Sequence, residues 1–476
     1  STIQSLSLDS CRQLAINQNK ALQIASEKER KAYYDKKAAF TQYLPNFSFT
    51  GSYLRNQKQL SLLDADKFLP IGTVMSDGSF GFTPSQVKGE VLPNGQWVPI
   101  DANGQPFDPT QNPEKIQWNE YTTIPKSEFD IDIRNVWVGV LSVVQPVYMG
   151  GKIAAYNKIT QYAHNLAGTQ KETELQNLLL ETDQAYWQVV SLVNKQKLTT
   201  AYADLLRKME EDVDHLINEG LATKADGLNV KVKRNEAEMA QTKVSNGLSL
   251  SRMLLAQICG LPMDSEIKLD DEEAETLSIP GSRLNVNVSE ALLERPELKS
   301  LTLATQMMAK KEAIVRSELL PTIALTGSYM VTNPNSFNGF QKKFGGMWNI
   351  GVVVNVPIFH WGERFHNLSA AKAETRIKQL ELAEAKEKVE LQVNQSVFRL
   401  NEAEKTLLTA YENKESAAEN LHYAQLGFSE GVISVSQVME AQTAWLKAQS
   451  ELIDAQIDNQ LARVYLKKAT GNIQKH

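Results

Sequence analysis

The sequence has little cysteine, no excess of basic residues and no long apolar run. Its 476 residues include two cysteines, Cys11 and Cys259, too few for a dense disulfide framework. They form either a single bridge or two buried thiols, and we expect buried thiols; lipidation is a third alternative that the sequence leaves open. The formal net charge of -6 excludes a basic surface for nucleic acid. No run of 18 apolar residues occurs, which excludes ordinary transmembrane helices and leaves either no membrane span or a β-barrel.

The motifs of common enzymes are also missing. There is no phosphate-binding loop, no glycine-rich dinucleotide motif and no nucleophile elbow. His360 and His366 lack a metal-ligand spacing, and Met307-Met308 is typical of core packing rather than a copper site. We therefore expect no enzymatic activity, no cofactor and no metal site.

What the sequence does contain is an internal repeat. Thr-Gly-Ser-Tyr occurs at Thr50–Tyr53 and again at Thr326–Tyr329, an offset of 276. A second offset, 211, pairs Trp137 with Trp348 and Gly220 with Gly431, among other matches. Each offset holds over its whole block, so we predict a duplication, with the 65-residue difference between the offsets arising from an insertion in the first half.

The duplication divides the chain. We predict a first structural repeat over 1–260, an equatorial linker over 261–283, a second repeat over 284–471 and a tail over 472–476. The insertion corresponds to 57–126, which is rich in Gly, Pro, Asn and Asp and is typical of a long surface loop with short turns.

Within each repeat, the hydrophobic periodicity predicts helix, strand, loop, strand, very long helix, tight turn and helix. Alternating residues indicate strands over 46–56, 128–144, 322–332 and 344–356. Apolar spacings of three and four predict long helices over 152–219 and 363–430, followed by helices over 224–258 and 435–470. The two shorter helices of a repeat together match its long helix in length, so each half is expected to be a two-helix-thick rod.

The four strands suit a membrane. Each has about the length of a tilted membrane-spanning strand, with one apolar and one polar face. Aromatic residues expected at the membrane interfaces lie near the strand ends: Trp137, Tyr148, Trp348, Phe359 and Trp361. Four strands cannot close a barrel, and no open edge survives in a bilayer. Either several chains share one barrel, or the strands cap a structural or adhesive coiled coil of the cell surface that has no channel activity.

Several local features resemble the outer-membrane efflux protein family, the TolC-like exit ducts. They are the Leu-Pro helix exits at 44–45 and 320–321, the strand-to-helix passages over 145–151 and 355–362, and the helix-turn tips over 219–223 and 430–434. The resemblance covers essentially the whole chain. It implies an α+β membrane protein of the Gram-negative outer membrane, with a shared antiparallel β-barrel of four strands per chain and twelve per trimer. A long coiled-coil-like α-helical barrel continues it into the periplasm, and the 57–126 insertion lies outside the cell.

The resemblance also implies function and partners. The chain is expected to be a homotrimeric, passive duct of a tripartite efflux or type I secretion system. A periplasmic adaptor protein and an inner-membrane RND or ABC pump dock onto it and open it.

Two groups of residues are candidates for these roles. The tips, which the resemblance assigns to adaptor docking, comprise Gly220, Leu221, Ala222, Thr223, Gly431, Val432, Ile433 and Ser434. Acidic residues six and nine positions after the second tip glycine ring the periplasmic gate in the family. Here these positions hold Gln437 and Glu440, and Gln437 departs from the family by lacking the charge. Asp226 is the equivalent in the first repeat. The alternatives are a plain helix turn for the tips and solvated helix charges for the gate.

Overall fold

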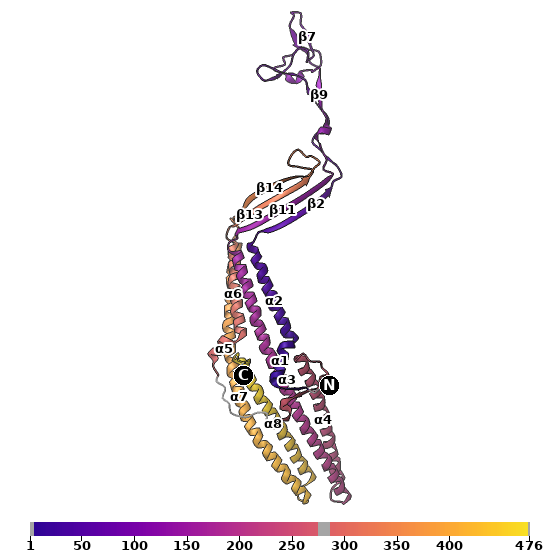
Figure 1. Ribbon diagram of the computed structural model, residues 1–476, viewed down its shortest axis with the longest axis vertical. Helices are drawn as coiled ribbons and strands as arrows, with labels where there is room; N and C mark the ends of the chain where they lie inside the picture. The colour runs from indigo at the N-terminus through magenta and orange to yellow at the C-terminus, as the bar shows by residue number, and fades with distance from the viewer. Residues whose placement is uncertain (1–3, 275–285, 475–476) are drawn as a thin grey trace. The chain divides into compact units, whose positions relative to one another are not determined.

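The computed structural model describes residues 4–274 and 286–474, which divide into two compact units (Figure 1). The helical unit comprises the described residues up to Tyr43, Met149–Pro321 and those from Val356 onward. The sheet unit comprises Leu44–Tyr148 and Thr322–Asn355. The structure is therefore helix-rich with one principal sheet, and the chain passes between the units four times.

The helical unit is built around two long helices of equal length. They are α3 (Lys152–Asn218) and α7 (Glu363–Ser429), each with 67 residues and therefore about 100 Å long. The shorter helices are α1 (Leu8–Gln18), α2 (Lys20–Phe40), α4 (Lys224–Ile258), α5 (Val288–Glu294), α6 (Pro296–Ser317) and α8 (Val435–Ala469). The helices α1, α2 and α4 pack along α3, and α5 packs along α7 (Figure 1). The helices α6 and α8 each contact both long helices. None of the described helices combines the length and apolar character needed to cross a bilayer.

A buried junction joins the start of the chain to the end of α4. The strand β1 (Gln4–Leu6) pairs in parallel with β12 (Ile267–Leu269), and the 3-10 helix η4 (Asp270–Glu273) follows. Beneath this pairing, Arg12 donates from Nε to Asp183 Oδ1 at 2.7 Å, with the Asp183 side chain fully buried. Of the predicted linker, the part after residue 274 up to 283 lies outside the described residues, as do the last two residues of the predicted tail.

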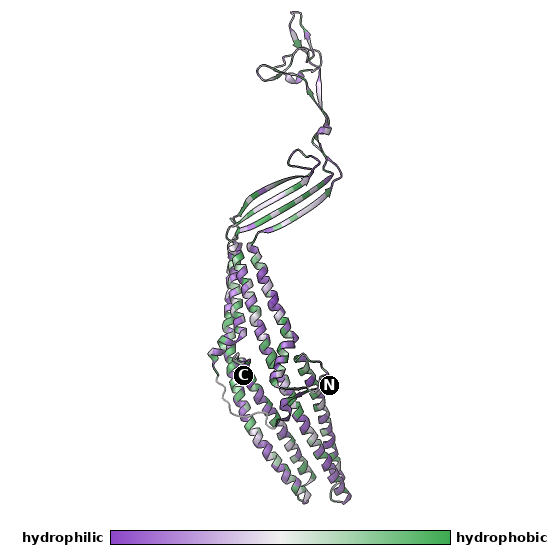
Figure 2. Cartoon of the chain, viewed as in Figure 1, coloured by the Kyte–Doolittle hydropathy of each residue, from purple (hydrophilic) through white to green (hydrophobic). Residues whose placement is uncertain are grey.

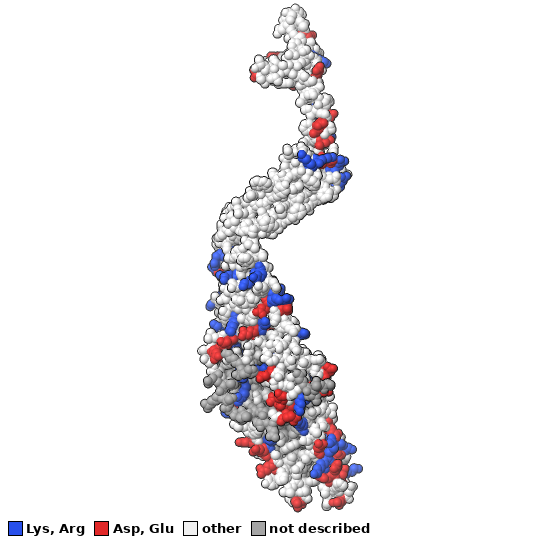
Figure 3. All heavy atoms as spheres, in the orientation of Figure 1, with Lys and Arg blue, Asp and Glu red and all other residues white. Residues whose placement is uncertain are grey.

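The sheet unit contains a four-stranded antiparallel sheet in the order β14-β13-β11-β2. Its strands are β2 (Asn46–Arg55), β11 (Asn135–Tyr148), β13 (Thr322–Asn333) and β14 (Gly345–Asn355). Arg55, at the end of β2, is the only charged residue in these strands. Figure 3 accordingly shows the sheet as an uncharged stretch. In the described part of the chain, β2 and β14 each have one edge that pairs with no other strand.

The strand β11 differs from the predicted strand at both ends. It starts at Asn135 rather than 128, because Ile131 pairs in the short strand β10 (Asp130–Ile131) with β3 (Leu60–Ser61). It also continues through Pro146 to Tyr148. Proline lacks the N–H for a ladder bond, but β2 stops pairing at Val144, so one side of Pro146 already has no partner strand.

The predicted 57–126 insertion carries short strand pairs rather than turns alone. They are β4 (Lys67–Pro70) with β9 (Tyr121–Ile124), β5 (Thr73–Val74) with β6 (Phe80–Gly81), and β7 (Gly89–Val91) with β8 (Trp97–Pro99). Phe82 packs edge-on against Trp118, with ring centroids 6.0 Å apart, and also contacts Trp97. The insertion thus has its own small aromatic cluster. The remaining 3-10 helices are η1 (Thr41–Tyr43), η2 (Pro113–Lys115) and η3 (Lys126–Phe129).

Candidate functional site

One face of the four-stranded sheet is almost entirely apolar and uncovered within the sheet unit. The strand register places every second residue on this face, and Figure 2 shows the resulting hydrophobic stripes. We call it the apolar face; its exposed large side chains are Phe47, Phe49, Tyr53, Trp137, Leu141, Leu325, Tyr329, Trp348, Ile350, Val352 and Val354. Ile350, in the middle of β14, is 78% exposed. A water-soluble protein rarely leaves so large a contiguous apolar surface bare.

The opposite face carries a row of small polar side chains across all four strands. The register aligns Ser48, Ser142, Ser328 and Asn349, one from each strand. The Ser48 and Ser142 hydroxyls are 3.2 Å apart, and Asn349 Nδ2 donates to Ser328 Oγ at 2.8 Å. The two faces of the sheet therefore differ in polarity, as the sequence alternation predicts.

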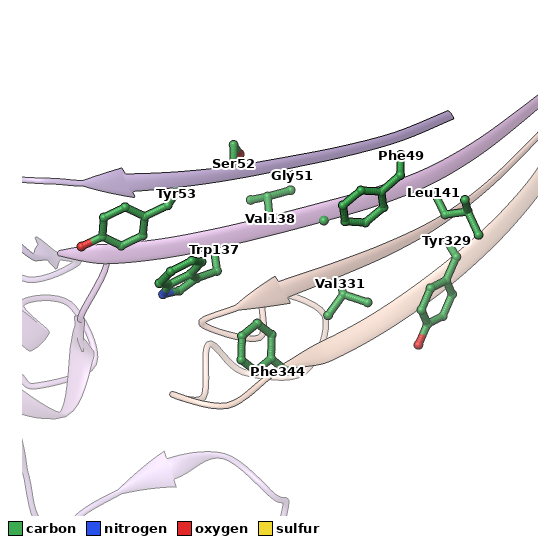
Figure 4. Close-up of a pocket in the computed structure, with 11 residues that line it drawn as sticks. Phe49, Gly51, Ser52, Tyr53, Trp137, Val138, Leu141, Tyr329, Val331 and Phe344 are labelled. Atoms are coloured by element: carbon green, nitrogen blue, oxygen red, sulfur yellow. The ribbon is translucent and has the colours of Figure 1, made fainter. Parts of the chain in front are cut away.

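Aromatic rings gather near one end of the apolar face. Tyr53 and Trp137 lie opposite each other on β2 and β11, with ring centroids 4.4 Å apart. Beside them Gly51 faces Gly139, and the Phe49 ring lies over this glycine pair, 3.4 Å from where a β-carbon would stand on either residue. Together with Phe344 the rings surround a hollow of about 510 Å³ whose lining contains no charged residue (Figure 4). The hollow is suited to an apolar chain.

The other predicted interface aromatics divide between the two units. Trp348 lies on the apolar face and is largely exposed, and Tyr148 ends β11. Phe359 and Trp361 belong to the helical unit and pack edge-on, with ring centroids 4.9 Å apart. Trp361 is 89% exposed.

Trp361 is held in an unfavourable backbone conformation. Its φ of 50° is in the left-handed region, which bulky residues rarely adopt. The 211 offset places Gly150 at the same position of the first repeat, with φ 66°. There a β-carbon would stand 2.9 Å from the carbonyl oxygen of Ser317, so glycine is required. An exposed tryptophan that stabilises no core and is strained where glycine would fit points to a function of its side chain.

The two tips have the same backbone geometry. Gly220 and Gly431 have φ values of 76° and 75°, and each follows the last turn of its long helix. The next residue donates back to the helix: Leu221 N to Leu216 O at 2.8 Å, and Val432 N to Gly427 O at 2.8 Å. This is the hydrogen-bond pattern by which glycine ends a helix.

The tip residues have different surroundings. Ala222 and Ile433 pack against a shared cluster of buried residues from α3, α4 and α8, namely Met209, Val213, Val230, Val435 and Val438. Leu221 and Val432, in contrast, are 72% and 80% exposed. Each tip thus presents one bare apolar side chain on a rigid turn.

Two of the three predicted gate residues cap helices. Asp226 accepts from the Thr223 amide at 2.9 Å and from its hydroxyl at 2.6 Å, while Thr223 Oγ1 accepts from the Asp226 amide. Gln437 forms the same capping box with Ser434, accepting at 3.1 Å from the amide. These bonds hold the pKa of the Asp226 carboxyl below its ordinary value.

Glu440 has no such structural use. Its side chain is exposed, and it forms no ion pair or hydrogen bond within 4–274 and 286–474. Over the same ranges, no bond joins Glu440 to Asp226 or Gln437. The structure therefore distinguishes Glu440, which has no such contacts, from Asp226 and Gln437, which form the capping boxes at the tips.

Contacts between α3 and α8 could not be predicted from the sequence. Lys195 of α3 pairs with Asp454 of α8 at 2.7 Å, although the residues are far apart in the chain. The Tyr202 and Leu206 side chains of α3 pack against Trp445 and Leu446 of α8. The ion pair is half exposed and contributes little by itself, roughly 0–1 kcal/mol, so the apolar contacts dominate this joint.

Among the residues that the structure describes, no group of three or more His, Cys, Asp and Glu side chains that could hold a metal ion comes together. His360 instead lies 3.2 Å from a guanidinium nitrogen of Arg364.

Comparisons with known proteins agree on one family. A family model described as outer membrane efflux protein matches residues 287–472. Outer membrane protein TolC of Escherichia coli K12 is 22% identical over 348 residues, which cover 70% of this chain and 69% of that protein. The cation efflux system protein CusC of the same strain is 23% identical over 300 residues, covering 61% of this chain and 59% of that protein.

The fold comparison extends over nearly the whole chain. A solved structure of the outer-membrane channel OprN superposes with a TM-score of 0.72 at 12% sequence identity. The superposition covers 98% of this chain and 90% of that one. The chain therefore has the fold of these channels.

The two capping boxes predict different responses to pH. The Asp226 pKa is lowered in the folded state, so its cap stabilises the first tip above the unfolded pKa of the carboxyl and is lost as pH falls through the lower folded pKa. The Gln437 cap does not titrate. Hydrogen-exchange protection of the Thr223 amide should fall on acidification, whereas that of the Ser434 amide should not. Asp226→Asn should remove the difference, and parallel pH responses of both amides in the unmodified protein would contradict the account.

Proposed function

We propose that the chain is a member of the outer membrane efflux protein family and serves as an exit duct of efflux systems in the Gram-negative outer membrane, with three copies sharing one barrel and one helical tunnel. The match of the family model to residues 287–472, the TolC relatives and the fold of the OprN channel support this proposal. The family consists of channels rather than enzymes. The observation that carries the proposal is the four-stranded sheet, whose only charged residue is Arg55 and whose two outer edges pair with no strand in the described part of the chain.

The sheet supports a shared barrel because a bilayer offers no hydrogen bonds to a strand edge. Joining the β14 edge of one chain to the β2 edge of the next pairs both edges and closes the sheet. The number of chains comes from the family likeness, and it makes twelve strands. In this barrel the apolar face contacts lipid, while the row of Ser48, Ser142, Ser328 and Asn349 lines the lumen. The 57–126 insertion lies outside the cell.

The helical unit is proposed to line a tunnel through the periplasm. Equal long helices with matched partners in both repeats support a quasi-symmetric wall, six-fold in pattern from three duplicated chains. The aromatic pair Phe359 and Trp361 suits the periplasmic membrane interface, where an amphipathic ring gains enough to offset the strain at Trp361. The duct itself is passive, so the energy for export comes from the pump.

The tips are proposed to dock a periplasmic adaptor that links the duct to an inner-membrane RND or ABC pump. Leu221 and Val432 provide exposed apolar anchors, and Gly220 and Gly431 provide the turns that present them. The pump selects the cargo. Relatives with names as different as cation efflux system protein and solvent efflux pump outer membrane protein are consistent with such a division.

At the gate, three copies of Glu440 are proposed to form an acidic ring. Its exposure and its lack of structural contacts support this role. Like charges brought together in a pore favour cations and bind divalent ions. Asp226 and Gln437 shape the nearby turns, and they contribute to the gate through position rather than through a free charge.

The sheet faces provide a test with adjacent residues. Ile350→Arg places a charge on the proposed lipid face near mid-strand, and should cost about 2–4 kcal/mol and reduce the amount of inserted trimer. Asn349→Arg, one residue away on the lumen face, should insert normally. Heat-modifiable trimer in outer-membrane fractions measures both. Equal loss for the two variants, or a greater loss for Asn349→Arg, would show that the faces are wrongly assigned.

The gate can be tested by moving charge in both directions. Glu440→Gln should lower cation preference and weaken block by divalent ions in planar bilayers. Gln437→Glu adds a charge while keeping the capping box, since glutamate serves as well as glutamine there, and should strengthen both. If neither variant changes ion preference or block, Glu440 does not face the pore.

Docking is tested at the exposed tip side chains. Val432→Asp and Leu221→Asp should abolish export in cells while leaving trimer levels intact, because a charge replaces an apolar anchor. Thr409→Asp, a change at an exposed position on α7, is the control and should export normally. Normal export by both tip variants would remove the tips from the docking surface.

A further inference from the structure

The two cysteines of the chain meet at the junction between the N-terminal segment and the end of α4. Cys11 lies in the first turn of α1, and Cys259 is the C-terminal cap of α4, 248 positions later. Both are fully buried. The Cys259 thiol donates to the carbonyl oxygen of Cys11 at 3.6 Å, so the two residues are in direct contact.

The backbone on either side of the thiol pair is fixed. Asn19 Nδ2 donates to the carbonyl oxygen of Ile258 at 3.0 Å, the residue before Cys259. Gly260, the residue after it, approaches Gln18 so closely that a β-carbon would stand 2.6 Å from the Gln18 side chain. Together with the β1–β12 pairing, these contacts fix the backbone around Cys259 against the N-terminal segment that carries Cys11.

The second repeat has the same junction. The two offsets place Arg295 and Ala469 at the positions of Asn19 and Ile258. Arg295 Nη1 donates to the Ala469 carbonyl oxygen at 3.1 Å, as Asn19 does to that of Ile258. The junction can thus be built from a side chain that donates to the last carbonyls of a helix.

The second junction contains no sulfur. The positions of Cys11 and Cys259 are occupied there by Asn287 and Thr470. Asn287 caps α5 and accepts from the Ser289 amide, and the Thr470 hydroxyl donates to the Leu466 carbonyl oxygen at 3.0 Å. The junction does not require thiols for packing, so the paired thiols of the first repeat need another explanation.

We propose that Cys11 and Cys259 are oxidised to an intramolecular disulfide in the mature protein, which covalently joins α1 to the end of α4. The inference rests on the proposed placement of the helical unit in the periplasm, an oxidising compartment where disulfides form and persist. The link would close a loop of nearly 250 residues. It would secure the point where two short helices meet beside α3.

The oxidant is a periplasmic thiol oxidase that carries a catalytic disulfide. One cysteine thiolate attacks this disulfide, which forms a mixed disulfide and releases one enzyme thiol. The thiolate of the second cysteine then attacks the sulfur of the first cysteine in the mixed disulfide. This forms the intramolecular disulfide and releases the second thiol of the oxidase. Two electrons pass to the oxidase, and the two cysteine protons leave with its thiols. The hydrogen bond with Cys259 and burial raise the pKa of the folded Cys11 thiol, so this exchange belongs to folding, before the junction is buried.

The redox state is measured by trapping thiols at the moment of lysis. Cells producing the full-length protein are precipitated in acid and dissolved in denaturant with a maleimide-coupled polymer. We expect no adduct without prior reduction and two adducts after it. Cys11→Ala and Cys259→Ala should each give one adduct in both lanes. Two adducts without reduction in the unmodified protein would overturn the proposal.

A stability measurement separates a disulfide from two packed thiols. Reductant should lower the thermal transition of the purified trimer by roughly 5 °C, and it should not affect the Cys11→Ala/Cys259→Ala double variant. The double variant should also be no less stable than either single variant. Adduct counting on the heated sample confirms that reductant has reached the cysteines, and an unchanged transition in protein that carries two adducts only after this reduction would contradict a stabilising disulfide.

Export is assayed separately on the same strains. Free thiols in a protein that exports normally would overturn the disulfide and leave the proposed function standing. A disulfide in a protein that does not insert or export would overturn the proposed function and leave the disulfide standing.

Discussion

A strand edge in a bilayer must be hydrogen-bonded to another strand, and the proposed assembly and function of this protein depend on this constraint. The four principal strands are uncharged apart from Arg55, and one of their faces is bare and apolar. Yet β2 and β14 each keep one unpaired edge in the described part of the chain. The proposal that the sheet resides in a membrane and the proposal that other copies complete it therefore rest on the same feature. The helices have the opposite character, since none of those described could cross a bilayer by itself.

The predicted duplication is matched by similar elements in the two halves of the chain. The two long helices have the same length, the two tips have the same turn geometry, and the short helices meet at equivalent junctions. The two halves differ at a few positions where one of them carries a residue type that the other lacks. Trp361 replaces Gly150 despite its backbone strain, and the thiol pair replaces Asn287 and Thr470.

The periodic parts of the fold were accessible from the sequence, because apolar spacing directly reflects which face is buried. The helices and the four strands are of this kind, whereas the tip glycines were found from the 211-residue offset and the family resemblance. The start of β11 was not, since Ile131 continues the alternation although it pairs in another small sheet. The pairs Arg12–Asp183 and Lys195–Asp454 were also inaccessible, because nothing local marks residues that meet across the chain. The sequence predicts Gln437 and Asp226 as gate residues, but only the structure reveals that both cap helices.

The central claim is that this chain forms a closed barrel only when it assembles with other copies of itself. Purification from membranes in detergent, followed by single-particle imaging and mass measurement, tests it most directly. The account predicts three copies around one axis, a closed barrel of twelve strands and a helical tunnel continuous with it. A water-soluble monomer without a barrel would contradict the account.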